Sequence, residues 1–119
     1  MIKSIAFTMY PAQDLARARD FYERLLGLRP SRDFGGAWIE YDLGGGTFAM
    51  STMAEGVTPS ADAGGSIAFE VADVDGLVAR LRDQGVRIKV APFTTPVCRM
   101  AVILDSEGNA LTLHQATTN

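Results

Sequence analysis

The first quarter of the chain changes from a strand-like to a helix-like pattern of apolar residues. Residues 4–10 are rich in strand formers, and Pro11, which has no amide hydrogen to donate, is expected to end the strand. Asp14 then provides a helix N-cap, and apolar residues recur at helical spacing as far as Gly27, a residue typical just beyond a helix C-terminus. The pattern predicts a strand followed by a helix over 14–26.

Short strand-like segments separated by turn residues follow this helix. They lie at about 28–34, 36–42 and 46–53, and a glycine-rich turn joins the last two. The same order then recurs. It gives a strand over 66–71, a helix that begins after Asp73 or Asp75 and ends at Gly85, and strands at about 87–91, 97–104 and 110–115.

Matching aspartates indicate that the chain is an internal duplication. Asp14 and Asp73 open the two helices, and Asp42 and Asp105 open the last turn of each half. A linker from Glu55 to Gly65 divides the halves, which span about 1–58 and 64–119. We therefore expect a single domain over 1–119 of the α+β class, in which two βαβββ modules form a curved mixed sheet around a central cleft.

Charge and composition exclude several classes of partner. The net charge is −3 and the Lys and Arg residues do not cluster, which argues against a nucleic-acid partner. No apolar run approaches the roughly 18 residues that span a bilayer, so no membrane partner is expected. The start of the chain lacks the pattern of a signal peptide, and the lone Cys98 cannot form an intrachain disulfide. These features predict a cytoplasmic protein.

Three motifs, in order along the chain, resemble those of a known superfamily. Residues 14–22 (DLARARDFY), followed by LGL at 26–28, resemble its opening helix, D-L-x-R-(A/S)-x-x-F-Y…L-G. Residues 105–109 (DSEGN) resemble its D-P-D-G-N turn with serine in place of proline, and residues 66–71 resemble the strand that opens its second half. The chain is therefore similar to the glyoxalase and bleomycin-resistance proteins of the vicinal oxygen chelate superfamily, which includes extradiol dioxygenases.

The resemblance implies a divalent metal ion held by His, Gln or Glu side chains, one from each of four strands that line the cleft. At those positions this chain has Phe7, Ser66, Thr112 and Ala49, or Met50 if the first loop carries one extra residue. None of these side chains is a strong ligand, because divalent metals need imidazole, thiolate or carboxylate donors. We therefore expect the family cleft without its metal ion and without a cofactor.

Aromatic and charged residues near these positions are candidates for contact with a ligand. Trp38 and Glu40 share one face of a strand, and the repeat register places Arg99 and Ala101 on the corresponding face. Trp38 is either a wall for a flat ligand or a core residue. Arg99 either holds an anionic ligand through two hydrogen bonds or forms a surface ion pair.

The remaining candidates each have a structural alternative. Alternation places Leu111 and Leu113 on the helix-covered face, and Thr112 and His114 on the other. His114, the only histidine, either donates to a ligand or lies at the solvent rim. Cys98 is expected to be a small core residue. Met9 and Met50 either line an adaptable pocket or fill the core.

These observations favour a metal-free protein that binds a small molecule of unidentified structure. The resemblance also implies a homodimer, because family members commonly complete their clefts by pairing halves within or between chains. The expected ligand-binding residues are Phe7, Met9, Trp38, Glu40, Ala49, Ser66, Arg99, Thr112 and His114. No catalytic residue is assigned. One alternative is a lyase, isomerase or dioxygenase-like enzyme, with displaced metal ligands or with Glu70, Glu40 or His114 as a base. The other is a structural or regulatory dimer with a vestigial cleft.

Overall fold

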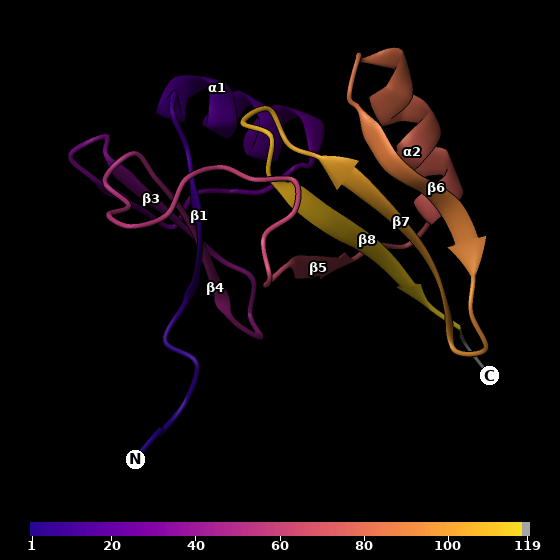
Figure 1. The fold of residues 1–119 in the computed structure, drawn as a ribbon, viewed down its shortest axis with the longest axis horizontal. Helices are drawn as coiled ribbons and strands as arrows, with labels where there is room; N and C mark the ends of the chain where they lie inside the picture. The colour runs from indigo at the N-terminus through magenta and orange to yellow at the C-terminus, as the bar shows by residue number, and fades with distance from the viewer. Residues whose placement is uncertain (118–119) are drawn as a thin grey trace. The chain divides into compact units, whose positions relative to one another are not determined.

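Each half of the chain folds as a strand, a helix and three further strands, in the computed structural model that describes residues 1–117 (Figure 1). The first unit is Met1–Pro59 and the second begins at Ser60. The elements of the first unit are β1 (Thr8–Pro11), α1 (Leu15–Arg19), the π-helical segment η1 (Asp20–Leu25), β2 (Arg32–Phe34), β3 (Trp38–Asp42) and β4 (Thr47–Ser51). Those of the second are β5 (Ile67–Glu70), α2 (Val74–Asp83), β6 (Ile88–Thr94), β7 (Cys98–Leu104) and β8 (Ala110–Ala116).

The two sheets have the same strand order. It is β1-β4-β3-β2 in the first unit and β5-β8-β7-β6 in the second. In each sheet the first strand runs parallel to the last, and the other neighbours are antiparallel. The structure therefore confirms the α+β class and the two βαβββ modules.

Both helices begin at the aspartates that the repeat singled out. Asp14 accepts a hydrogen bond from the backbone N–H of Arg17 at 3.0 Å, and Asp73 accepts one from the N–H of Gly76 at 3.1 Å. Asp73 rather than Asp75 is therefore the second N-cap. Gly27 follows the first helix with a φ of 77°, a left-handed conformation that favours glycine.

The expected boundaries of the first strand are wrong at both ends. Pairing with β4 begins at Thr8, so residues 4–7 lie outside the strand, and it continues through Pro11. Proline is tolerated there because β1 lies at the edge of its sheet, where one side of the strand needs no N–H donor. The next strand, expected from residue 28, begins only at Arg32.

The first helix changes from α to π geometry after Arg19. The N–H of Leu26 donates to the carbonyl of Phe21, five residues back, at 3.1 Å. Glu23, in this segment, accepts hydrogen bonds at one carboxylate oxygen from the Tyr41 hydroxyl at 2.9 Å and from Arg19 Nε at 2.7 Å. Burial of the Tyr41 ring, and then this hydrogen bond, raise the pKa of its hydroxyl well above the usual range.

One face of each sheet packs against the helix of its own unit. In the first unit, Phe48 and Met50 are fully buried on this helix face, and the Phe48 ring lies 5.0 Å from that of Tyr22 in η1. In the second unit, Leu111 and Leu113 occupy the same place on β8, as alternation predicts. Cys98 is buried as expected, but on the opposite face of the sheet, where it is paired with Ala116.

An ion pair joins α2 to β7 on the helix face of the second sheet. Arg99 Nε lies 2.5 Å from one Asp75 carboxylate oxygen, and its Nη2 lies 2.7 Å from the other. Arg99 therefore forms the surface ion pair rather than sharing a face with Trp38. The guanidinium holds the pKa of the Asp75 carboxyl below its usual range, through hydrogen bonds and then charge.

One extra residue in a turn explains why the repeat register misplaced Arg99 and Ala101. Asp42 is the last paired residue of β3, opposite Thr47, whereas Asp105 lies beyond the last pair of β7, Leu104 with Ala110. A shift of one residue moves every side chain of a strand to the other face. Ala101 is accordingly buried on the helix face. Met100 and Val102 are instead the structural counterparts of Trp38 and Glu40.

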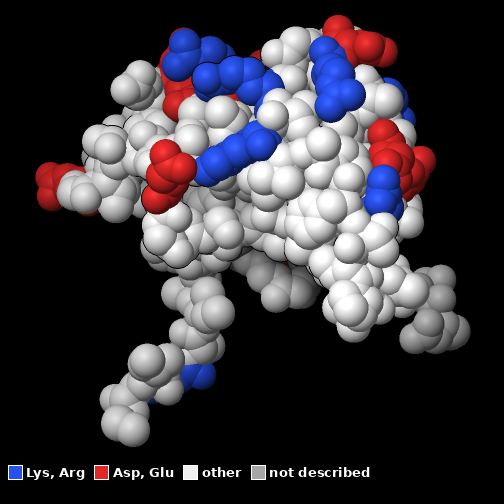
Figure 2. Space-filling model, turned by 45° about the vertical axis from the view of Figure 1, so that its right-hand side comes forward, with Lys and Arg blue, Asp and Glu red and all other residues white. Residues whose placement is uncertain are grey.

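Lys and Arg side chains lie beside Asp and Glu side chains on the face drawn in Figure 2. Among residues 1–117, no helix has both the length and the apolar character needed to cross a bilayer.

Replacing Tyr41 by phenylalanine tests the buried hydrogen bond. Tyr41→Phe should lower the free energy of unfolding by about 1 kcal/mol, because Glu23 loses one donor. Urea denaturation measures this loss. In a double-mutant cycle with Glu23→Ala, which removes the acceptor, the two losses should sum to more than the loss in the double variant; additive losses would contradict the coupling.

Removing the Asp75 carboxylate should destabilise the protein at pH 7, and the loss should shrink as the pH falls below the unfolded pKa of the carboxyl. A carboxyl whose pKa is lowered by folding contributes stability above its unfolded pKa, and the contribution disappears as the pH falls through the folded pKa. Melting temperatures of Asp75→Asn and of the wild type should therefore converge on acidification. Arg99→Gln should show the same loss at pH 7. A gap between Asp75→Asn and the wild type that is independent of pH would contradict this assignment.

Candidate functional site

The face of the first sheet opposite the helix carries most of the candidates that the sequence predicts for this unit. Met9, Ala49 and Glu40 are neighbours across β1, β4 and β3. In the next row, Pro11, Ser51 and Trp38 are neighbours in the same order. Because cross-strand partners point to the same side of a sheet, the expected residues of the first half are brought together.

Trp38 is held between an aromatic ring and a carboxylate. Its indole N–H donates to Glu40 Oε2 at 2.9 Å. Phe7, in the segment before β1, packs edge-on against the indole, with ring centroids 5.1 Å apart and an interplanar angle of 89°. The Phe7 side chain is nevertheless 46% exposed. This arrangement fixes the indole while leaving aromatic surface accessible beside it.

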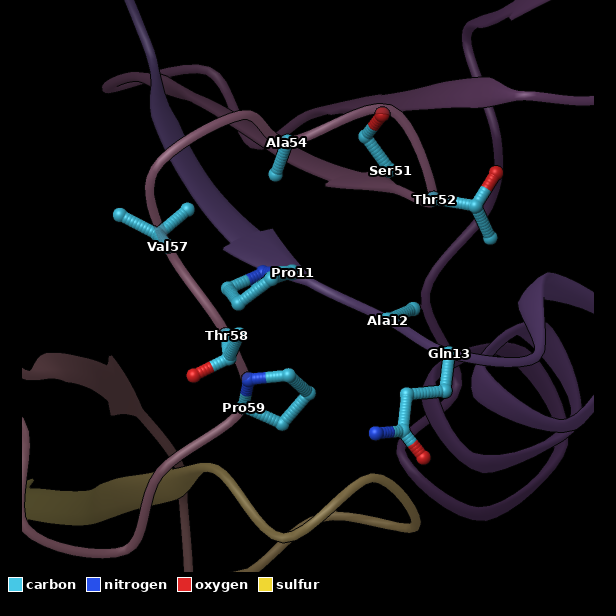
Figure 3. Close-up of a pocket in the computed structure, with 9 residues that line it drawn as sticks. All are labelled: Pro11, Ala12, Gln13, Ser51, Thr52, Ala54, Val57, Thr58 and Pro59. Carbon is cyan, nitrogen blue, oxygen red and sulfur yellow. The ribbon is translucent and has the colours of Figure 1, made fainter.

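A pocket of about 280 Å³ adjoins this face at the ends of β1 and β4 (Figure 3). Its lining contains no charged side chain and consists of Pro11, Ala12, Gln13, Ser51, Thr52, Ala54, Val57, Thr58 and Pro59. Ser51 connects the pocket to the aromatic pair, because it is the cross-strand partner of Trp38. The volume is near the lower limit of about 300 Å³ for small-molecule sites.

No pattern in the sequence predicts this pocket. One wall comes from the segment that follows β4, part of which we interpreted only as a linker between halves. Ser51 is fully buried, and its hydroxyl donates to the carbonyl of Ala37 at 2.9 Å and accepts from the N–H of Met53 at 2.9 Å. These hydrogen bonds hold the start of the pocket wall against the sheet.

The corresponding face of the second sheet carries Thr112 and His114. Thr112 is paired with Ala68 on β5 and Val102 on β7, and His114 is paired with Glu70 and Met100. Ser66 is exposed directly before β5, as Phe7 is before β1.

The imidazole of His114 is bound to a carboxylate on the neighbouring parallel strand. Its Nδ1 lies 2.5 Å from Glu70 Oε1, and Glu70 Oε2 accepts the backbone N–H of Ala116 at 2.8 Å. The N–H of Ala116, and then the imidazole, lower the pKa of the Glu70 carboxyl below its usual range. Glu70 is therefore an ionised acceptor at neutral pH, and His114 is not a solitary rim residue.

The four positions at which the family places metal ligands do not offer a suitable donor set. Phe7 and Ala49 have no lone pair on their side chains, and the hydroxyls of Ser66 and Thr112 are weak ligands. The parallel pairing supports Ala49 rather than Met50 as the counterpart of Thr112, because Met50 lies on the helix face. Within residues 1–117, no three His, Cys, Asp or Glu side chains gather to hold a metal ion.

Comparison with solved structures shows relatives of the same fold along nearly the whole chain. TnmS3, an antibiotic binding protein from Streptomyces sp. CB03234, is 25% identical over 98% of both chains, with a TM-score of 0.79. A glyoxalase/bleomycin resistance protein from the same strain is 27% identical over 94% of this chain and 100% of its own, with a TM-score of 0.75.

A lactoylglutathione lyase from Agrobacterium tumefaciens, 20% identical, covers 96% of this chain and 94% of its own at a TM-score of 0.72, and it shows the fold alone. No curated protein sequence matches the chain. The sequence profile of one superfamily matches residues 4–113. The chain therefore belongs to the Glyoxalase/Bleomycin resistance protein/Dioxygenase superfamily.

Proposed function

We propose that this protein binds a small, flat, largely apolar molecule and holds it without a metal ion. It acts as a cytoplasmic homodimer. The observation that carries the proposal is the fixed Trp38 beside an uncharged pocket in the first unit.

The chemistry of the first unit favours apolar contact over chelation. Phe7 occupies a position where the family places a metal ligand, and its ring packs on Trp38 instead. Aromatic surface of this kind contributes large contact area to a bound ring at little cost in side-chain entropy, because the indole is already held by Glu40. The pocket supplies only hydroxyl and amide groups for orientation.

The relatives support the same class of ligand. TnmS3 is an antibiotic binding protein and covers 98% of this chain at 25% identity. A drug-like organic molecule is therefore the class of ligand that we propose here.

One observation favours a second candidate function, an enzyme that moves protons without a metal ion. The imidazole of His114 is oriented by the ionised Glu70 carboxylate, the arrangement that general bases use in many active sites. Its neighbours on this face, Met100 on β7 and Thr112 on β8, provide no second acid. Turnover of a bound compound that is lost in His114→Gln would favour this function over binding alone.

Fluorescence of Trp38, the only tryptophan, tests the binding function directly. A panel of flat aromatic compounds should include members that quench Trp38 and raise the melting temperature. Phe7→Ala should weaken this binding and lower the free energy of unfolding by only about 1 kcal/mol, because the ring is half exposed. A fully packed phenylalanine would cost about 3–5 kcal/mol.

Leu43→Ala is the matched control, because Leu43 is an apolar side chain of the same unit and is exposed to nearly the same extent as Phe7, but it lies in the turn after β3. It should leave quenching of Trp38 unchanged. A large loss of stability in Phe7→Ala, together with the failure of every compound in the panel to bind, would instead identify Phe7 as a core residue and contradict the proposed function.

The divalent ions Ni²⁺, Zn²⁺, Mn²⁺ and Fe²⁺ should not raise the melting temperature of the wild type.

Light scattering at micromolar concentration should show a dimer. Two features support this expectation: β1 and β5 lie at edges of their sheets, and the segment before β1 exposes Ile2 and Ile5. Figure 1 shows this segment leading away from β1. A monomeric mass would contradict the proposed homodimer without affecting the proposed ligand site.

A further inference from the structure

The hydrogen bond between Glu70 and His114 fixes both the position and the tautomer of the imidazole. The carboxylate is itself held at its second oxygen by the N–H of Ala116. An ionised carboxylate accepts but does not donate, so in the neutral imidazole the proton must lie on Nδ1. The lone pair is then on Nε2.

The surroundings of the ring are mostly apolar on this face. Met100 is the neighbour of His114 on β7, and Phe93 follows on β6 and is 38% exposed. The next row contributes Val102 and the Thr112 hydroxyl. The nearest cationic side chain on β7, Arg99, lies on the helix face and is paired with Asp75.

The charge of the Glu70–His114 pair limits which ligands can bind beside it. A neutral imidazole bound to a carboxylate carries a net negative charge, which repels anionic ligands. A neutral donor avoids this repulsion and satisfies Nε2, and the apolar neighbours suit a ring that carries the donor.

We propose that the pair of Glu70 and His114 is the hydrogen-bond acceptor of the ligand site in the second unit, and that it selects a neutral aromatic ligand bearing a phenolic or enolic hydroxyl. The inference rests on the proposed small-molecule-binding function and assigns the polar group of a ligand that binds in the second unit. The hydroxyl donates to Nε2 of His114, and no covalent bond changes.

The first test needs no ligand, because His114 is the only histidine and gives one set of imidazole resonances. Nitrogen-15 spectra of the neutral ring should show the proton on Nδ1. In Glu70→Gln this preference should disappear. The Nε2-protonated tautomer in the wild type would overturn the inference.

The second test compares 2-naphthol with 2-methoxynaphthalene, which has the same ring but no hydroxyl proton. The wild type should bind 2-naphthol about tenfold more tightly, a typical effect of one hydrogen bond, and the imidazole resonances should shift on binding. Glu70→Gln should abolish this preference. Asp75→Asn removes a carboxylate from the helix face of the same unit and should retain it.

Equal affinity for the two compounds overturns the inference and leaves small-molecule binding intact. Binding of neither compound also overturns it. If no compound of the aromatic panel quenches Trp38 fluorescence either, the proposed function is contradicted as well.

Discussion

The packing of one face of each sheet against a helix determines where every other side chain of this fold lies. Phe48 and Met50 in the first unit, and Leu111 and Leu113 in the second, are almost completely buried on that face. A slip of one residue would bury their polar neighbours in the core, so the register is strongly specified. The residues between them are therefore confined to the opposite face, where Ala49, Thr112 and His114 lie.

Much of this arrangement could be predicted, because capping and alternation are local. Asp14 and Asp73 begin the helices as expected, and the resemblance placed Phe7 and Ser66 at equivalent positions, directly before β1 and β5. Features that depend on partners distant in sequence were not accessible in this way. Parallel pairing places Glu70 beside His114, which is 44 residues further along the chain. No periodic pattern in the sequence predicts this contact.

On the face opposite the helix, each sheet uses a carboxylate to hold a ring in place. Glu40 fixes the indole of Trp38, and Glu70 fixes the imidazole of His114. Each ring is thereby held in one orientation, which would reduce the entropy lost in the binding that we propose. Sequence alone placed Trp38 and Glu40 on one face but did not reveal that they are bonded to each other.

The extra residue in the turn after β7 also bears on how a duplicated gene diverges. While two copies have hairpins of equal length, recombination between them exchanges equivalent residues and keeps the halves alike. Here the turn between Leu104 and Ala110 is one residue longer than the turn between Asp42 and Thr47, so a crossover within the turns would join segments of unequal length. Because a shift of one residue turns the side chains of a strand to the opposite face, the two halves no longer exchange equivalent positions, and each can carry its own residues on the face opposite the helix.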